Sequence, residues 1–275
     1  MESEFINLSV QQTRKFIKEH LEQEYLLIDV RQPHEYTKGH IPGALLLPLS
    51  ELSARMGELA ADRDLLFYCR SGHRSQAAAI FAANQAGAEG RKVYNMEGGI
   101  LAWDGVTATN VPNLNAFDMI GPPSQLLFQA MEMERGAERL YQELMKRFQQ
   151  PILQQLLDVL VRAEEGHARA VYRYWAEQED SPAPFELVYR QLKGDILEGG
   201  IEVSHALDSV EKQAESPCRV VFELALAVEF AAYDLYRSLA HYFAGQKLEK
   251  TFLAIAQAEK EHMRIVAEAI GSCDN

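Results

Sequence analysis

Two copies of one pattern of carboxylate and imidazole side chains occur in the C-terminal half of the sequence. AMEMERGAERLY at 130–141 aligns with ALAVEFAAYDLY at 225–236, and LVRAEEGH at 160–167 aligns with IAQAEKEH at 255–262. Both alignments have an offset of 95 residues, which indicates one structural unit that occurs twice. The side chains that coincide are Glu134 with Glu229, Glu164 with Glu259, and His167 with His262.

These six side chains suit a pair of metal ions. Glu and His three residues apart project from one face of a helix, so four facing helices would direct four carboxylates and two imidazoles into one core. Such donors favour two iron ions, with manganese as the alternative. A single Glu-x-x-His is usually a solvated surface pair, but the duplication and the apolar neighbours of Glu134 and Glu229 favour burial. Without metal, buried carboxylates would repel one another and raise their pKa values.

Cys69 is the candidate nucleophile of the N-terminal half. It ends the apolar run LLFYC and precedes RSGHRS and an alanine-rich helical pattern. A cysteine between a buried strand and a helix N-terminus faces backbone N–H groups and a helix dipole, which favour the thiolate. We predict that Cys69 attacks sulfur and that an anion-binding loop surrounds it. The loop residues are Arg70, Ser71, Gly72, His73, Arg74 and Ser75.

An inert buried thiol and a phosphatase nucleophile are the alternatives for Cys69. Gly72 and the two arginines within five residues argue against an inert thiol. Cysteine phosphatases place five residues between Cys and Arg to hold a tetrahedral phosphate, whereas four residues separate Cys69 from Arg74 here. The shorter loop favours sulfur chemistry.

The segments that must position Cys69 alternate between short apolar runs and helical patterns. We predict strands at 25–30, 44–47, 65–69 and 93–95, and helices at about 75–86 and at about 10–19, the latter capped by Ser9. This alternation is typical of an α/β domain with a mainly parallel, buried sheet.

The C-terminal half shows long helical patterns instead. Apolar residues recur at helical spacing over about 124–149, 151–178, 217–244 and 247–271, and Pro151 begins the second pattern. A long connection at 179–216, with short helices expected inside it, is typical of a ferritin-like four-helix bundle. We therefore predict an α/β domain at 1–110, a linker at 111–123 and an all-α bundle at 124–275.

Composition narrows the functional class. The net charge of −13, of which −10 falls after residue 110, argues against nucleic acid as a partner. No apolar stretch is long enough for a membrane span and the N-terminus lacks signal-peptide features, so no membrane partner is expected and the expected compartment is the cytoplasm. Three cysteines without a CxxC predict neither a disulfide framework nor structural zinc. Cys218 and Cys273 are expected to be incidental thiols.

The N-terminal half resembles single-domain rhodaneses over about residues 5–108. The matching segments are LLIDVRQPHEYTKGHIPGA at 26–44, FYCRSGHRS at 67–75 and VYNMEGGILAW at 93–103. The resemblance implies a sulfurtransferase in which Cys69 accepts sulfane sulfur from thiosulfate or a persulfide and passes it to a thiol acceptor. It also implies structural roles for Asp29, Arg31, Glu35 and His40, and a tight turn at Gly98 and Gly99.

The C-terminal half resembles the rubrerythrin branch of the ferritin-like family over about 124–271, on the full set of six ligands. The resemblance implies a di-iron site, peroxide or oxygen as candidate substrates, and a homodimer. Tyr141 and Tyr236 match tyrosines that can hydrogen-bond ligand carboxylates, with plain core packing as the alternative. Two features depart from the family: rubrerythrins carry a further Glu where Ala232 stands, and no rubredoxin-like CxxC pair is present.

The sequence supports two functional hypotheses. In the first, the chain is an enzyme of sulfur metabolism whose two sites cooperate, with a Cys69 persulfide serving a di-iron oxidoreductase. In the second, the bundle handles iron or protects against oxidative stress, and the sulfurtransferase domain is accessory. Dependence of the metal-centre reaction on Cys69 distinguishes the two.

Overall fold

The computed structural model describes residues 5–85, 90–108, 122–211, 217–271 and 273. The chain divides into two units, of which the first comprises residues 1–111 with 236–257 and the second comprises 112–235 with 258–275. The predicted linker at 111–123 lies outside the described residues except for its last two positions. Within the described ranges, no helix combines the length and the apolar character needed to cross a bilayer.

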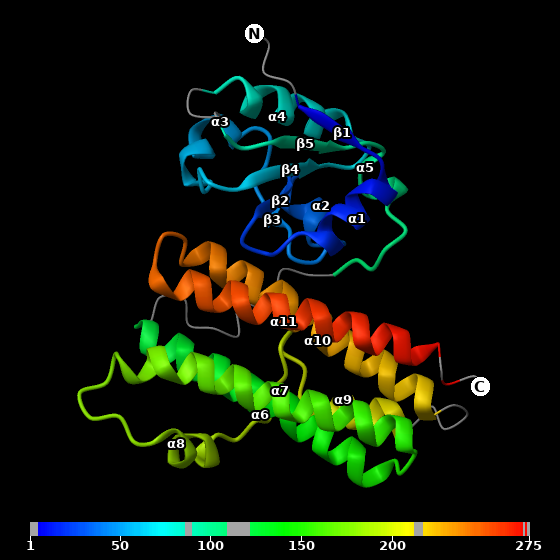
Figure 1. Ribbon diagram of the computed structural model, residues 1–275, viewed down its shortest axis with the longest axis vertical. Coiled ribbons are helices and arrows are strands. Elements are labelled where there is room, and N and C mark those ends of the chain that lie inside the picture. The colour runs from blue at the N-terminus through cyan, green and yellow to red at the C-terminus, as the bar shows by residue number, and fades with distance from the viewer. Residues whose placement is uncertain (1–4, 86–89, 109–121, 212–216, 272, 274–275) are drawn as a thin grey trace. The chain divides into compact units, whose positions relative to one another are not determined.

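A five-stranded parallel sheet forms the centre of the first unit, in the order β1-β5-β4-β2-β3 (Figure 1). Its elements are β1 (Ile6–Leu8), α1 (Val10–Glu19), β2 (Tyr25–Asp29), α2 (Pro33–Tyr36), β3 (Leu45–Leu46), α3 (Leu52–Arg55), the 3-10 helix η1 (Met56–Glu58), β4 (Asp64–Tyr68), α4 (His73–Ala83), β5 (Val93–Met96) and α5 (Gly99–Ala102). The predicted α/β domain is confirmed. Only β1 was missed among these strands, because it is short and its first two residues are exposed.

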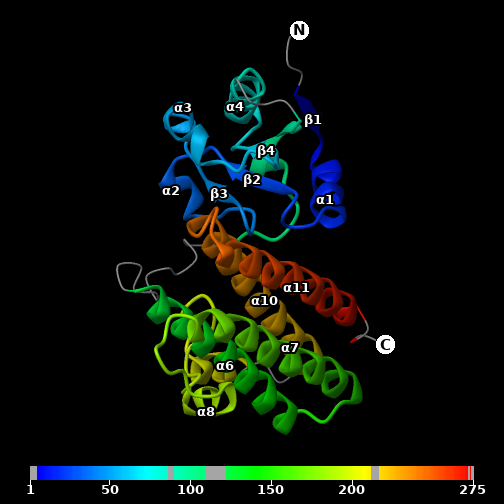
Figure 2. The same ribbon diagram turned by 60° about the vertical axis from the view of Figure 1, so that its left-hand side comes forward.

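Helices cover both faces of this sheet. Leu65 and Phe67 of β4 pack in a core with α3 and α4, whereas Leu66 and Tyr68 pack in a second core with α1, α2 and α5. Figure 2 shows α4 and α1 on opposite sides of the sheet. Because both faces are buried, the strands read as continuous apolar runs in the sequence.

The predicted cap of α1 is confirmed. The Ser9 hydroxyl accepts a hydrogen bond from the Gln12 backbone N–H at 3.2 Å, and the Gln12 side chain accepts one from the Ser9 backbone N–H at 2.8 Å. This reciprocal pair satisfies two donors that the first turn of a helix would otherwise leave unpaired.

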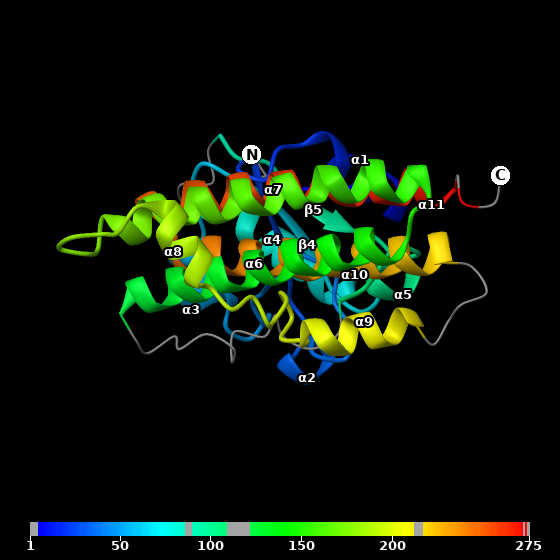
Figure 3. The ribbon, with the colours of Figure 1, turned by 90° about the horizontal axis from the view of Figure 1, so that it is seen from below.

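Four long helices supply the core of the second unit: α6 (Pro123–Arg147), α7 (Pro151–Ala176), and the parts of α10 (Pro217–Tyr242) and α11 (Lys247–Ile270) that belong to it. Leu140, Leu157, Phe222 and Val266, one from each helix, belong to a single apolar cluster. α6 and α7 lie side by side (Figure 3). The predicted helical bundle is confirmed. The connection between α7 and α10 contains the expected short helices, α8 (Phe185–Gln191) and α9 (Val203–Glu211).

A disulfide joins Cys218, near the start of α10, to Cys273, just after α11. The expectation that these cysteines are incidental thiols is therefore wrong. The two residues are 55 positions apart, and only the folding back of α11 along α10 brings their side chains together. Cys69 is left as a free, buried thiol.

Loss of this disulfide should destabilise the second unit. A bond that closes a loop of this length removes chain entropy from the unfolded state, and native disulfides typically contribute about 2–4 kcal/mol. We expect Cys218→Ser to lower the free energy of unfolding of the oxidised protein by that amount, measured by denaturant titration. Reductant should produce the same loss in the wild type and in Cys69→Ser but none in Cys218→Ser. A reductant effect that survives in Cys218→Ser would contradict the assignment.

Candidate functional sites

Cys69 follows β4 directly and precedes the amino end of α4. The residue is 1% exposed. The Gly72 backbone N–H donates to Cys69 Sγ at 3.2 Å, and the Ser75 hydroxyl donates to the same atom at 3.5 Å. Burial raises the pKa of the thiol, but hydrogen bonds from the Ser75 hydroxyl and from the backbone of Ser75, Ser71 and Gly72 outweigh burial, and the pKa lies below its ordinary value.

Two glycines with left-handed backbone shape the loop around Cys69. Gly72, the residue before α4, has φ +95°, and a Cβ there would lie 3.1 Å from the Gly98 nitrogen. Gly99 has φ +57°, and a Cβ there would lie 2.4 Å from the Cys69 carbonyl oxygen. Instead, the Ile100 N–H donates to that oxygen at 2.8 Å. The turn predicted at Gly98 and Gly99 therefore packs against the Cys69 loop and holds its backbone in place.

Arg74 forms a bidentate ion pair with Glu35, with N–O distances of 2.7 and 2.8 Å. The hydrogen bond from Arg74 lowers the pKa of the Glu35 carboxyl to about 2. Glu35 raises the pKa of the Arg74 guanidinium, and Cys69 raises it to a smaller extent, against the opposing effect of burial. The Arg74 charge is thus shared between Glu35 and the Cys69 loop, and Glu35 fixes the arginine beside the loop.

The remaining loop residues differ in exposure. Arg70, Ser71 and His73 are exposed, whereas Gly72 and Ser75 are buried. The Ser75 hydroxyl oxygen also lies 2.6 Å from the side-chain oxygen of Asn95 on β5, so Asn95 and Cys69 Sγ are alternative acceptors for its single proton. The sequence analysis did not predict the contact with Asn95.

Three of the four residues with implied structural roles lie in buried contacts. Arg31 pairs with Asp29 at 2.6 Å and donates to the Gly39 carbonyl at 2.7 Å. His40 is buried and stacks on the Tyr36 ring, with 3.7 Å between ring centroids. These contacts brace the segment that follows β2.

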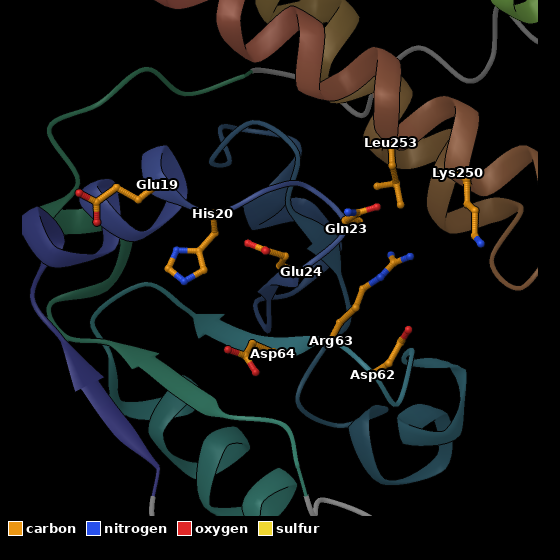
Figure 4. Close-up of a pocket in the computed structure, with 9 residues that line it drawn as sticks. All are labelled: Glu19, His20, Gln23, Glu24, Asp62, Arg63, Asp64, Lys250 and Leu253. Carbon is orange, nitrogen blue, oxygen red and sulfur yellow. The ribbon is translucent and has the colours of Figure 1, made fainter.

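A polar pocket of about 700 Å³ opens at the other end of β4 (Figure 4). Asp64 begins β4 and lines this pocket, whereas Cys69 follows the last residue of the strand. The lining residues, all in the first unit, are Glu19, His20, Gln23, Glu24, Asp62, Arg63, Asp64, Lys250 and Leu253. The pocket includes none of the predicted loop residues, so we assign it no part in the Cys69 site.

The six predicted metal ligands come together in the interior of the second unit, where each is at most 9% exposed. His167 Nδ1 lies 2.8 Å from a Glu259 oxygen. The same nitrogen lies 3.4 Å from an oxygen of Glu134 and 3.4 Å from an oxygen of Glu164. One ligand atom from each of these four side chains can be chosen so that all lie within 4.8 Å of one another. We call the six side chains the carboxylate cluster.

The other imidazole of the carboxylate cluster has its own carboxylate partners. His262 Nδ1 lies 3.1 Å from an oxygen of Glu229 and 3.1 Å from an oxygen of Glu259. The Tyr141 hydroxyl donates to the second Glu229 oxygen at 2.5 Å. Tyr141 therefore contacts a cluster carboxylate, as one of the two alternatives for it anticipated, and Glu259 lies between both imidazoles.

Crowded negative charge perturbs the pKa values in the carboxylate cluster. Burial and the nearby Glu259 raise the pKa of Glu229 to about 8. Burial lowers the pKa of His167, but Glu259 and Glu134 raise it more strongly, to well above its usual range. Glu229 and His167 thus hold protons that divalent cations would displace. The oxygen-rich donor set fits two iron or manganese ions.

Glu198 was not predicted and lies near the carboxylate cluster, in the connection between α8 and α9. It is 2% exposed, and burial together with Glu134 raises the pKa of its carboxyl. Glu198 has no counterpart in the 95-residue repeat, so self-comparison of the sequence had no signal that could find it.

These features define a cysteine-centred α/β domain joined to a helical bundle with a buried carboxylate and imidazole cluster. Residues 13–105 match the family model of the rhodanese-like domain, and residues 221–275 match the family model of rubrerythrin. The chain belongs to the rhodanese-like family through its N-terminal domain and carries a rubrerythrin-like bundle after it. The rubrerythrin match begins within α10, so it covers only the second copy of the repeat.

Individual relatives are similar to part of the chain. A protein named sulfurtransferase from Allochromatium vinosum is 43% identical over 81 residues, which are 30% of this chain and 73% of that protein. The thiosulfate sulfurtransferase GlpE of Pseudoalteromonas translucida is 30% identical over 107 residues, 39% of this chain and 96% of the relative. A rhodanese-related protein of Thermoplasma volcanium, known from its crystal structure, has 27% identity and a TM-score of 0.33 over 38% of this chain and 98% of its own. The N-terminal domain is a rhodanese sulfurtransferase domain.

Cys69 should ionise below the pH typical of a free cysteine. Its pKa is lowered, so the rate of alkylation by iodoacetamide should rise with pH through a midpoint below about 8.5. Ser75→Ala should raise that midpoint, because a donor to Sγ is lost. Ser71→Ala is the matched control, since the Ser71 hydroxyl contacts His73 and not Sγ. Equal midpoints in the wild type and Ser75→Ala would contradict the role of Ser75.

Proposed function

We propose that Cys69 is the nucleophile of this sulfurtransferase and carries a persulfide between two half-reactions. The Cys69 thiolate attacks the outer sulfur of thiosulfate, or the terminal sulfur of a persulfide. The sulfur–sulfur bond of the donor breaks, and sulfite or a thiolate leaves. An acceptor thiolate then attacks the terminal sulfur of Cys69, and the Cys69 thiolate is regenerated.

The donors that converge on Cys69 Sγ are the observation that carries this proposal. A persulfide extends the thiol by one sulfur and keeps the negative charge at its end, within the loop of residues 70–75. Backbone N–H groups at the amino end of α4 stabilise that anion. Arg74 adds less than a free guanidinium would, because Glu35 already shares its charge.

Treatment with thiosulfate should add one sulfur atom to the chain. Peptide mass spectrometry should place that sulfur on Cys69, since the other two cysteines form a disulfide. We expect Cys69→Ser to lose transfer activity. Arg74→Ala should weaken donor binding by about 1.5 kcal/mol, the lower end of the typical range for a hydrogen bond to a charged group, because Glu35 shares the Arg74 charge. Persistent transfer by Cys69→Ser would remove Cys69 from the mechanism.

We propose that the carboxylate cluster holds two metal ions, iron in the first place, and that the bundle is a redox centre for peroxide, oxygen or sulfur compounds. When bound, the ions supply electron transfer. The residues of the chain orient the site: Tyr141 holds one oxygen of Glu229, and His167 and His262 fix the remaining carboxylates. The alternative function is iron handling or stress protection, with the rhodanese domain as an accessory. The carboxylate cluster supports both functions equally.

The proposal also includes a homodimer and a cytoplasmic location. The homodimer is supported by the resemblance to rubrerythrins alone. Cytoplasmic location stays a prediction, and the Cys218–Cys273 disulfide weighs against it, because disulfides are rare in reducing compartments.

Metal analysis tests the second site. Protein purified without oxygen should approach two iron or manganese ions per chain. Glu164→Ala should lose metal, because Glu164 is a cluster carboxylate. Glu165→Ala is the matched control, since Glu165 is exposed and pairs with Arg169. Chelation should lower the thermal midpoint of the wild type, by linkage of metal binding to folding. A Glu164→Ala protein with a full metal complement would refute the assignment.

A further inference from the structure

We propose that Glu198 is a fifth carboxylate ligand of the metal centre, supplied by the connection between α8 and α9 and not by a bundle helix. This inference rests on the proposed two-metal function of the carboxylate cluster. It adds a residue that the internal repeat of the sequence does not contain.

Glu198 is buried without the partners that a buried carboxylate requires. It is 2% exposed, and among the residues that the structure describes no other residue donates a hydrogen bond to either of its oxygens; only its own backbone N–H comes near them. Its charge interacts most strongly with that of Glu134, and then with those of Glu259 and Glu229. A buried carboxylate that faces other carboxylates is costly unless a cation lies between them.

A tight turn sets the backbone of Glu198. The Leu197 N–H donates to the Ile201 carbonyl at 2.9 Å, and the Gly200 N–H donates back to the Leu197 carbonyl at 2.9 Å. Gly199 and Gly200 have φ values of +87° and +77°, a conformation that other residues adopt at a cost. The turn that contains Glu198 is therefore specified by its own sequence, EGG at 198–200.

Helix α6 holds this connection at two points that flank Glu134. Glu132 accepts hydrogen bonds from the Gly194 N–H at 2.8 Å and from the Lys193 N–H at 3.2 Å. Gly136 lets the connection come close, because a Cβ there would lie 2.3 Å from the Ile196 carbonyl oxygen. The connection runs beside α6 in Figure 3. The anchors therefore fix the connection along α6, and Leu197, next to Glu198, packs in the same apolar cluster as Ala137 and Tyr141, whose hydroxyl contacts Glu229.

The charge count indicates what a fifth carboxylate does. Four ionised carboxylates neutralise two divalent cations, and two imidazoles add no charge. A fifth carboxylate gives the site an excess negative charge, which increases its attraction for cations. Among the described residues, Glu198 belongs to neither of the groups whose ligand atoms all lie within 4.8 Å of one another. We therefore expect it to complete the coordination of one ion while the helix ligands hold the pair.

Cobalt(II) titration of the full-length, metal-free chain tests the proposal, because cobalt absorption in the visible range reports the ligands directly. Glu198→Gln keeps the shape of the side chain and removes the charge. We expect its cobalt affinity to fall on the order of 10–100-fold, the range known for groups that support a metal site, with an altered spectrum. Glu202→Gln is the matched control, since Glu202 closes the same turn but is exposed.

Thermal unfolding gives a second readout, because the substitution should change the stability of the metal-free and the cobalt-loaded protein in opposite directions. In the metal-free protein, Glu198→Gln should be at least as stable as the wild type, because a neutral amide of the same shape replaces a carboxyl group that is costly to ionise in this buried position. In the cobalt-loaded protein it should be less stable. If Glu164→Ala abolishes cobalt binding but Glu198→Gln leaves the affinity and the spectrum unchanged, the role of Glu198 is refuted and the proposed metal centre is not. Failure of the wild type to bind two cobalt ions would overturn the proposed metal centre as well.

Discussion

The burial of several carboxylates in one apolar core governs the organisation of the second unit. Glu134, Glu164, Glu229 and Glu259 come from four different helices and are nearly inaccessible to water. Their mutual repulsion would push the helices apart unless protons or cations lie between them. In the protein alone, His167 and His262 take that role. A pair of metal ions, as proposed, would do so more strongly, and metal binding would then be coupled to the folding of the bundle.

In the first unit, neutral hydrogen-bond donors, and not protons or cations, stabilise negative charge. Neutral donors, the Ser75 hydroxyl and backbone N–H groups around the start of α4, surround Cys69 Sγ and lower the pKa of the thiol. The donors are fixed by the Gly72 backbone and by the contact between the Gly99 turn and the Cys69 carbonyl. Such preorganised dipoles need no rearrangement when a persulfide forms. The proposed anion site is thus built mainly from backbone groups, whereas the proposed cation site is built from side chains.

The connection between α7 and α10 does more than join two halves of a repeat. Its α9 packs on α6, and the turn before α9 brings Glu198 towards the carboxylate cluster. Gly136 in α6 is explained by this contact, because any larger residue would collide with the Ile196 carbonyl. The two copies of the repeat are therefore not equivalent in the folded protein. The second copy carries the rubrerythrin family match, whereas the first is the one against which the connection packs.

Local signals in the sequence determined the elements of the fold and the residues that repeat. Strands buried on both faces read as apolar runs, Ser9 and Pro151 mark helix starts, and the shared offset reveals all six cluster residues, because helical periodicity is a local property. Tertiary structure decided the rest. The Cys218–Cys273 bond depends on how α11 folds back along α10, and the Arg74–Glu35 pair depends on the loop after β2 meeting α4. Glu198 is the clearest case: a lone Glu before two glycines reads as an exposed turn, and only packing of that turn against Gly136 buries it near the carboxylate cluster. Contacts between residues far apart in the chain leave no periodic pattern in the sequence. For this reason the sequence did not predict the disulfide, the Arg74–Glu35 pair or the burial of Glu198.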